Sequence, residues 1–83
     1  MSKRAQNERK FPNWVSLPEG GRRYWYDSLG EDFGYARYVK IVDQDEDTVA
    51  FYQEIYDNDG VLIEIHHKYP IDSGHQRVGG DQE

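Results

Sequence analysis

The sequence contains no cysteine, which excludes disulfide bonds, thiolate nucleophiles and cysteine-ligated zinc. It also lacks any apolar run near the roughly 20 residues that span a bilayer. Its first ten residues are polar and charged, unlike the apolar core of a signal peptide. We therefore expect a cytoplasmic protein with no membrane partner.

Positive charge is scarce outside the first ten residues. There, Lys3, Arg4, Arg9 and Lys10 outnumber Glu8 and give a net charge of +3, which leaves −9 for the other residues, given the total of −6. Nucleic-acid binding usually needs a basic face that neutralises phosphates and releases their counterions. An acidic body does not supply one, so a nucleic-acid partner is not expected. We interpret residues 1–10 as a flexible basic leader.

No long helical period is present, but β-rich runs alternate with clusters of Asp, Asn, Gly and Ser, as in a series of hairpins. Aromatic residues make up 14% of the chain, which argues against disorder. The expected strands are residues 22–27, 33–42, 48–57 and 61–69. We predict a mainly β domain at 11–70, a single antiparallel β-meander of about four strands, followed by a flexible C-terminal tail at 71–83.

A single sheet needs a cover for its apolar face. Residues 11–18 are the candidate cover, because Trp14, Val15 and Leu17 bring apolar side chains next to the sheet in sequence. A partner chain is the alternative cover. The sheet either stays open or curls into a small partial barrel.

The loops at 43–47 and 58–60 set the expected register of the last three strands. The Asn-Asp-Gly sequence of 58–60 suits a three-residue hairpin loop whose glycine adopts positive φ. With these two loop lengths, Phe51 lies opposite both Val39 and His67. Odd-numbered positions of all three strands then share one face, because side chains alternate along a strand.

A tyrosine row on the even-numbered face is the first candidate site. The expected register aligns Tyr38, Tyr52 and His66, with Tyr56 nearby. Rings with a polar tip are favoured at protein interfaces, although ordinary cross-strand pairing also explains such a row. We predict a non-catalytic protein-interaction module that binds another protein or a second copy of itself.

Polar residues interrupt the apolar odd-numbered face and form the second candidate site. Arg37, Gln53 and His67 would be costly there unless they are hydrogen-bonded. They either satisfy one another, lie at an open end of the sheet, or bind a ligand, in which case Arg37 would hold an anionic group.

A third cluster contains His67, Asp72 and His75, residue types that can ligate a metal. His66 points to the opposite face from His67, so only one of them can join. The alternative function is therefore a small metal-dependent hydrolase or an anionic-ligand-binding protein that uses His67, Asp72 and His75. No helical zinc-site spacing supports this. A non-enzymatic role without a cofactor is accordingly favoured.

Overall fold

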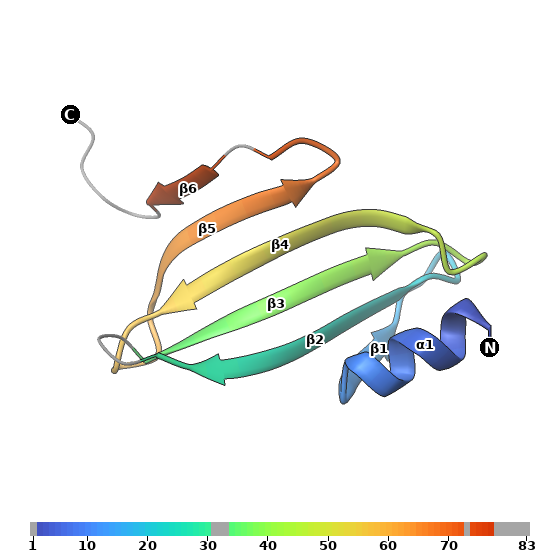
Figure 1. Cartoon of the computed structure of the whole chain (residues 1–83), viewed down its shortest axis with the longest axis horizontal. Coiled ribbons are helices and arrows are strands. Elements are labelled where there is room, and N and C mark those ends of the chain that lie inside the picture. Colours follow the sequence, from blue (N-terminus) through green and yellow to red (C-terminus); the bar gives the residue numbers. More distant parts are fainter. Residues whose placement is uncertain (1, 31–33, 73, 78–83) are drawn as a thin grey trace.

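The computed structural model describes residues 2–30, 34–72 and 74–77. Six strands pair antiparallel in one open sheet with the order β1-β2-β3-β4-β5-β6, so each strand lies beside its neighbours in sequence (Figure 1). In chain order the elements are α1 (Lys3–Lys10), β1 (Asn13–Ser16), β2 (Arg22–Leu29), β3 (Tyr35–Val42), β4 (Thr48–Tyr56), β5 (Leu62–Tyr69) and β6 (Gly74–Arg77). The predicted antiparallel meander is confirmed, and the two short outer strands add to the four expected ones.

Both chain ends carry more structure than the sequence analysis expects. Helix α1 occupies the residues interpreted as a flexible leader, and its first turn is capped by Ser2, whose Oγ accepts a hydrogen bond from the Ala5 amide at 3.0 Å. Strand β6 lies within the expected tail, of which residues 78–83 lie outside the described residues. Within the described ranges, none of the helical segments has the length and apolar character that a bilayer-spanning helix requires.

The two central hairpin loops have the predicted lengths. The Asp57 amide donates to the Val61 carbonyl at 2.9 Å, and Gly60 between them has a φ of 80°, which glycine adopts without strain. The Asp43 amide donates to the Asp47 carbonyl at 2.9 Å, which closes the five-residue loop. Turn chemistry in the sequence therefore located both hairpins correctly.

Bulges in β4 and β5 change the register and make the predicted side-chain parity wrong. Val49, Ile63 and Lys68 each fall between two paired residues and have no partner directly opposite. Each extra residue reverses the side to which the following residues point. Phe51 therefore pairs with Lys40 and Tyr69 rather than with Val39 and His67.

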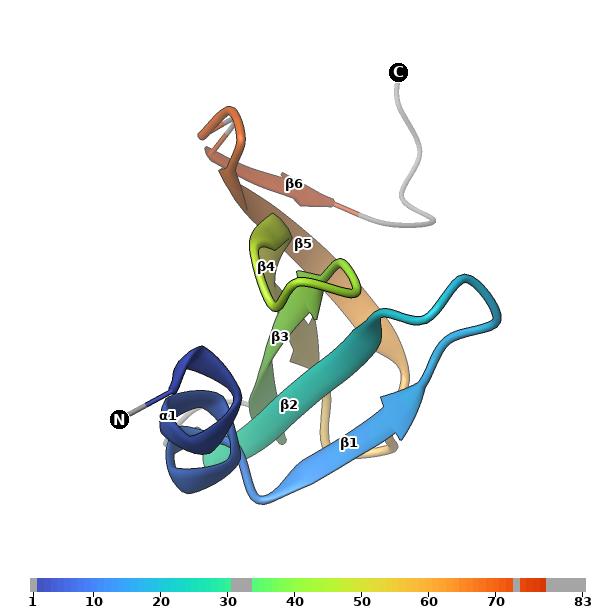
Figure 2. The ribbon, with the colours of Figure 1, turned by 90° about the vertical axis from the view of Figure 1, so that its right-hand side faces the viewer.

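Helix α1 lies against one side of the sheet, across β2 (Figure 2). We call this side the helix face; its residues include Tyr24, Tyr26, Lys40, Val42 and Phe51. The opposite side, which we call the open face, includes Trp25, Arg37, Val39, Tyr52 and Tyr56.

The main hydrophobic cluster lies between the helix face and Phe11, which directly follows α1. Phe11, Tyr24 and Val42 are buried, and the Phe11 ring lies 5.8 Å from the ring of Tyr24 and 5.5 Å from that of Tyr26. Burying one such side chain contributes about 1.5–3 kcal/mol. Of the expected cover at 11–18, Phe11 thus packs on the sheet, whereas residues 13–16 form the edge strand β1.

Candidate functional site: an aromatic groove on the helix face

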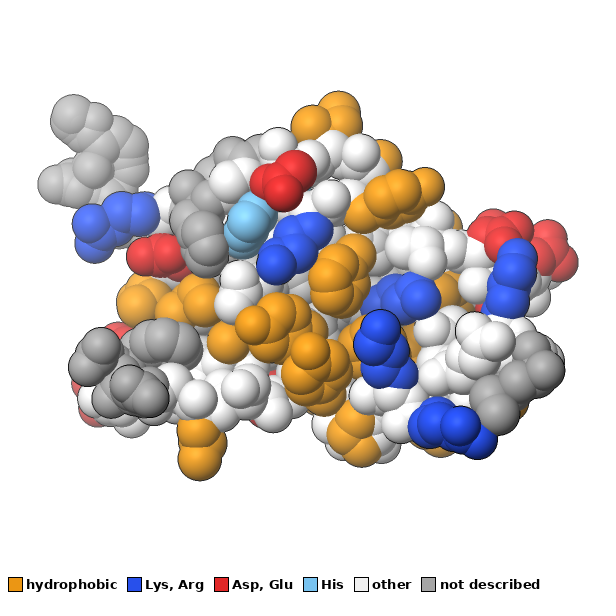
Figure 3. All heavy atoms as spheres, in the orientation of Figure 1, with side chains coloured by type: hydrophobic (Ala, Val, Ile, Leu, Met, Phe, Trp, Pro, Cys, Tyr) orange, Lys and Arg blue, Asp and Glu red, His pale blue; other side chains and the backbone are white. Residues whose placement is uncertain are grey.

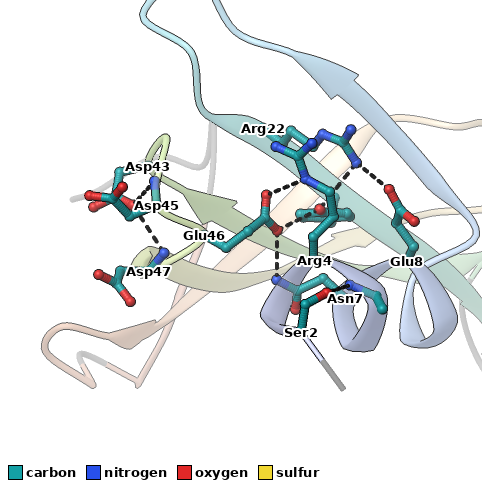
Figure 4. Close-up of polar contacts among 11 residues, drawn as sticks. Ser2, Arg4, Asn7, Glu8, Arg22, Asp43, Asp45, Glu46 and Asp47 are labelled. Carbon is teal, nitrogen blue, oxygen red and sulfur yellow. Dashed lines mark hydrogen bonds and ion pairs between the residues drawn. The ribbon is translucent and has the colours of Figure 1, made fainter.

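Helix α1 is held on the sheet by Glu46, a buried carboxylate in the β3–β4 loop. Its Oε2 accepts hydrogen bonds from the Tyr24 hydroxyl at 2.6 Å and from Asn7 Nδ2 at 3.1 Å, and its Oε1 accepts one from Arg4 Nε at 3.4 Å (Figure 4). Burial alone would raise the pKa of Glu46, but these hydrogen bonds outweigh it and lower the pKa. The charged carboxylate therefore ties α1 to a loop far away in sequence.

Two further contacts secure α1. Arg22 Nη1 donates to Glu8 Oε2 at 2.7 Å and to the Tyr24 hydroxyl at 3.3 Å, and the hydrogen bond to Glu8 is the main reason that the pKa of Arg22 is raised. Near the start of the helix, Lys3 forms an ion pair with Asp47. The position of α1, and of Phe11 after it, is thereby fixed relative to β2, β3 and β4.

Two rows of side chains cross the helix face beside α1. One row runs Trp14, Tyr24, Lys40, Phe51, Tyr69, and the next runs Tyr26, Tyr38, Gln53, His66. Figure 3 shows hydrophobic side chains gathered near the middle of this side of the molecule, with Lys and Arg side chains next to them.

A groove of about 720 Å³ lies between the end of α1 and these rows. Phe11, Tyr26, Phe51 and Tyr69 supply its aromatic lining. They come from four separate segments, and Tyr69 is 48% exposed. The groove is therefore an aromatic surface that a partner could reach.

The polar lining of the groove is mainly positive. Lys10 and Lys40 both line it, together with Asp47 and Thr48. Burial is the main cause of a lowered pKa of Lys40, and the nearby charge of Lys10 lowers it further, against a smaller opposite effect of Glu46. Among the ion pairs of the described residues, none involves Lys10 or Lys40, whereas Asp47 is paired with Lys3.

The predicted tyrosine row is split between the two faces. Tyr38 and His66 do share a row on the helix face, but Gln53 lies between them where Tyr52 was expected. The ring of Tyr52 lies on the open face, 5.6 Å from His67, and Tyr56 is also on that face. The bulge at Val49 shifts β4 by one residue against β3, which is why Gln53 rather than Tyr52 lies opposite Tyr38.

The predicted ligand set does not converge either. Arg37 and His67 lie on the open face, whereas Gln53 lies on the helix face and donates to the Tyr38 hydroxyl at 3.1 Å. Arg37 binds Asp27 in a bidentate manner, with distances of 2.8 and 3.1 Å. Arg37 and Gln53 are thus each satisfied by a neighbouring side chain.

The expected metal ligands are not brought together around His67. Asp72 Oδ1 lies 2.6 Å from His66 Nε2 instead, and this hydrogen bond is the main cause of the lowered pKa of Asp72. The backbone of His75 pairs with His66, and its side chain lies outside the described part of the structure. His66, rather than His67, is therefore the histidine that meets Asp72.

One carboxylate triplet with metal-site spacing occurs among the described residues. Asp43, Asp45 and Asp47 are exposed and offer oxygens within 4.8 Å of one another. Asp43 Oδ1 already accepts the amides of Asp45 at 2.9 Å and Asp47 at 3.0 Å, which is ordinary turn stabilisation. The triplet is accounted for by the loop that it shapes.

No sequence pattern marked Lys10, Lys40, Phe51 or Tyr69 as site residues. They converge only because α1 docks and the bulge at Val49 turns Phe51 toward the helix face.

Neither a known protein-family model, nor a curated protein, nor a solved structure matches this chain.

Proposed function

We propose that this chain is a non-catalytic protein-interaction module that docks a short segment of a partner protein in the aromatic groove. The observation that carries this proposal is the convergence of four aromatic side chains on one groove of about 720 Å³. Aromatic side chains dominate the energetics of protein interfaces, and the groove has the volume of typical binding pockets. The acidic, cysteine-free chain leads us to propose a cytoplasmic partner.

The dimensions of the groove suit an extended peptide. Its lining crosses from Tyr26 on β2 to Tyr69 on β5, a distance of three strand spacings or about 14 Å. An extended chain advances about 3.3 Å per residue, so roughly four residues would span it. The hydroxyl groups of Tyr26 and Tyr69 can meet the polar backbone of such a segment.

The described groove lining favours binding over catalysis. It contains no histidine, and its single carboxylate, Asp47, is already paired with Lys3. General acid–base chemistry and metal-assisted hydrolysis both depend on such groups placed beside the reacting atoms.

A selection from a phage library of random peptides tests the proposal. Wild-type protein should enrich peptides with a short apolar or aromatic centre, and their amide shift changes in ¹⁵N-labelled protein should map to Phe51, Tyr69 and their neighbours. Tyr69→Ala should weaken a selected peptide by about tenfold or more, because exposed aromatic anchors contribute most to binding. Tyr52→Ala, a tyrosine truncation on the open face, is the matched control.

Other results would contradict docking in the groove. These are a failed selection, shift changes on the open face, or equal affinity of the Tyr69→Ala and wild-type proteins. Light scattering of both proteins adds a further arm. A dimer of the wild type that Tyr69→Ala dissociates would identify a second copy, rather than a partner protein, as the occupant.

A further inference from the structure

Two lysines line the same aromatic groove, and neither forms an ion pair within the described ranges 2–30, 34–72 and 74–77. Lys10 ends α1, where the helix dipole favours a positive charge, and the buried Phe11 after it fixes its position. Lys40 lies in the row between Tyr24 and Phe51. Two like charges in a partly dehydrated site repel each other, and an anion bound between them would relieve that repulsion.

Lys40 lines the groove and retains hydrogen-bonding capacity. Its Nζ donates to Asn7 Oδ1 at 2.9 Å, and an ammonium group has three donors. The lowered pKa of Lys40, caused mainly by burial and then by the charge of Lys10, shows the cost of keeping it charged there. A ligand oxygen would restore the solvation that the folded chain removes.

We propose that Lys10 and Lys40 form an anion subsite that binds one carboxylate of the docked segment. This inference rests on the proposed docking function and defines the chemistry of the partner: a short segment in which an acidic residue adjoins an apolar or aromatic one. The carboxylate contacts the two lysines while the apolar side chain packs against Phe11 and Phe51.

A single carboxylate fits the groove better than a polyanion. Asp47 also lines the groove, and the carboxylates of Asp43 and Asp45 lie close to it. Lys3 neutralises Asp47, but the loop as a whole would repel the successive phosphates of a single-stranded nucleic acid. The total charge of −6 adds to that repulsion.

Three matched synthetic peptides test the subsite. Each has a phenylalanine–leucine centre, flanked on both sides by glutamate, by glutamine or by lysine, and each is titrated into ¹⁵N-labelled protein. The glutamate peptide should bind about tenfold more tightly than the glutamine peptide, because charge-assisted hydrogen bonds are the stronger kind. The lysine peptide should bind most weakly.

Variants of the protein separate a specific subsite from general attraction. Lys10→Gln should reduce the advantage of the glutamate peptide to about twofold or less, whereas Lys40→Arg, which keeps the charge, should retain most of it. Lys68→Gln is the matched control. It makes the same charge change next to Tyr38 on the helix face, outside the groove lining, and should change the affinity less than about twofold.

Other outcomes of these titrations would contradict either the anion subsite or the docking function. Equal affinities of the glutamate and glutamine peptides, with shift changes at Phe51 and Tyr69, would overturn the subsite and leave the docking function in place. An equal effect of Lys68→Gln and Lys10→Gln would also overturn the subsite. If no peptide shifts groove resonances, the docking function itself fails. A single-stranded oligonucleotide can also be added as a competitor. If it displaces the glutamate peptide at a concentration below that of the peptide, the occupant of the groove is a nucleic acid and not an acidic protein segment.

Discussion

Arg37 on the open face and the groove lysines Lys10 and Lys40 on the helix face differ in whether they are paired with a carboxylate. On the open face, Arg37 binds Asp27 through two hydrogen bonds and lies over the Trp25 ring at 5.8 Å. On the helix face, Lys10 and Lys40 line the groove, and neither belongs to an ion pair among the described residues. Arg37 thus serves folding, as Arg22 does on the helix face through its ion pair with Glu8, whereas the two groove lysines are left for a ligand in our proposal.

This difference predicts where mutations act. Changes to buried or paired groups should lower the free energy of unfolding, and a change to the exposed groove lysine Lys10 should affect binding while leaving stability almost unchanged.

Tyr24→Ala should have the largest effect, because Tyr24 is 0% exposed and packs against Phe11 at the centre of the helix face. Removing a buried aromatic ring costs about 3–5 kcal/mol, a large part of the stability of a small domain. Urea denaturation followed by circular dichroism measures the change. Tyr52→Ala on the open face is the control and should cost clearly less. Equal losses would remove the distinction between a core-bearing face and an open one.

Glu46→Gln should cost about 1–2 kcal/mol at neutral pH, because the amide accepts weaker hydrogen bonds from Tyr24, Asn7 and Arg4. The pKa of Glu46 is lowered in the folded state, so the charged carboxylate stabilises the fold fully above its ordinary pKa of 4.5. That contribution is lost as the pH falls through the folded-state pKa.

Urea denaturation of both proteins from about pH 7 down to about pH 3 checks this dependence. The wild type should lose its advantage over Glu46→Gln as the pH falls. A constant difference across that range would show that α1 is not held by the charge of Glu46.

Arg37→Leu should cost about 1–2 kcal/mol, because it removes the bidentate contact to Asp27 and the cation–π contact to Trp25. Lys10→Gln should change the free energy of unfolding by less than about 0.5 kcal/mol, since Lys10 has no acidic partner among the described residues. Both values come from urea denaturation at low salt. A reversed order of the two would break the contrast between the faces.

Tyr56→Phe should cost less than Arg37→Leu at neutral pH, about 0.5–1 kcal/mol, from loss of the hydrogen bond that the hydroxyl donates to Glu54 at 2.9 Å. Burial, followed by that hydrogen bond, raises the pKa of Tyr56 to about 12 from its ordinary value of 10.0.

The neutral phenol of Tyr56 therefore stabilises the fold below about pH 10, and its contribution is lost between about pH 10 and pH 12. Unfolding of wild type and Tyr56→Phe at rising pH should show the two stabilities converging. Direct NMR titration of the Tyr56 ring should give a midpoint well above that of an exposed tyrosine; an ordinary midpoint would contradict the stated environment.

The strands and both central hairpins were predictable because their signals are local. Residues 58–60 carry the turn residues that such a loop demands, and alternating apolar residues mark the strands on either side. The bulged residues Val49, Ile63 and Lys68 carry no such signal, since each is an ordinary strand residue. One inserted residue reverses the faces, which is why the predicted rows were divided although the strands were found.

The groove was not predictable from sequence, because it depends on contacts between distant segments. Helix α1 has eight residues and is mostly polar, so it lacks the apolar stripe by which an amphipathic helix is predicted. Its buried residue is Asn7, which binds Glu46 39 positions further along the chain. A single pair of residues so far apart produces no repeating pattern in the sequence from which the contact could be predicted.

The contact between Asn7 and Glu46 also has a consequence for the order of folding. Every strand pairs with its neighbour in sequence, so the sheet can form hairpin by hairpin with short loop closures. A helix of eight residues does not persist alone in water and needs the finished β3–β4 loop as its docking site. We therefore expect α1 to dock last. A nascent or partly unfolded chain would lack the groove, and recognition would be restricted to molecules that have completed their fold.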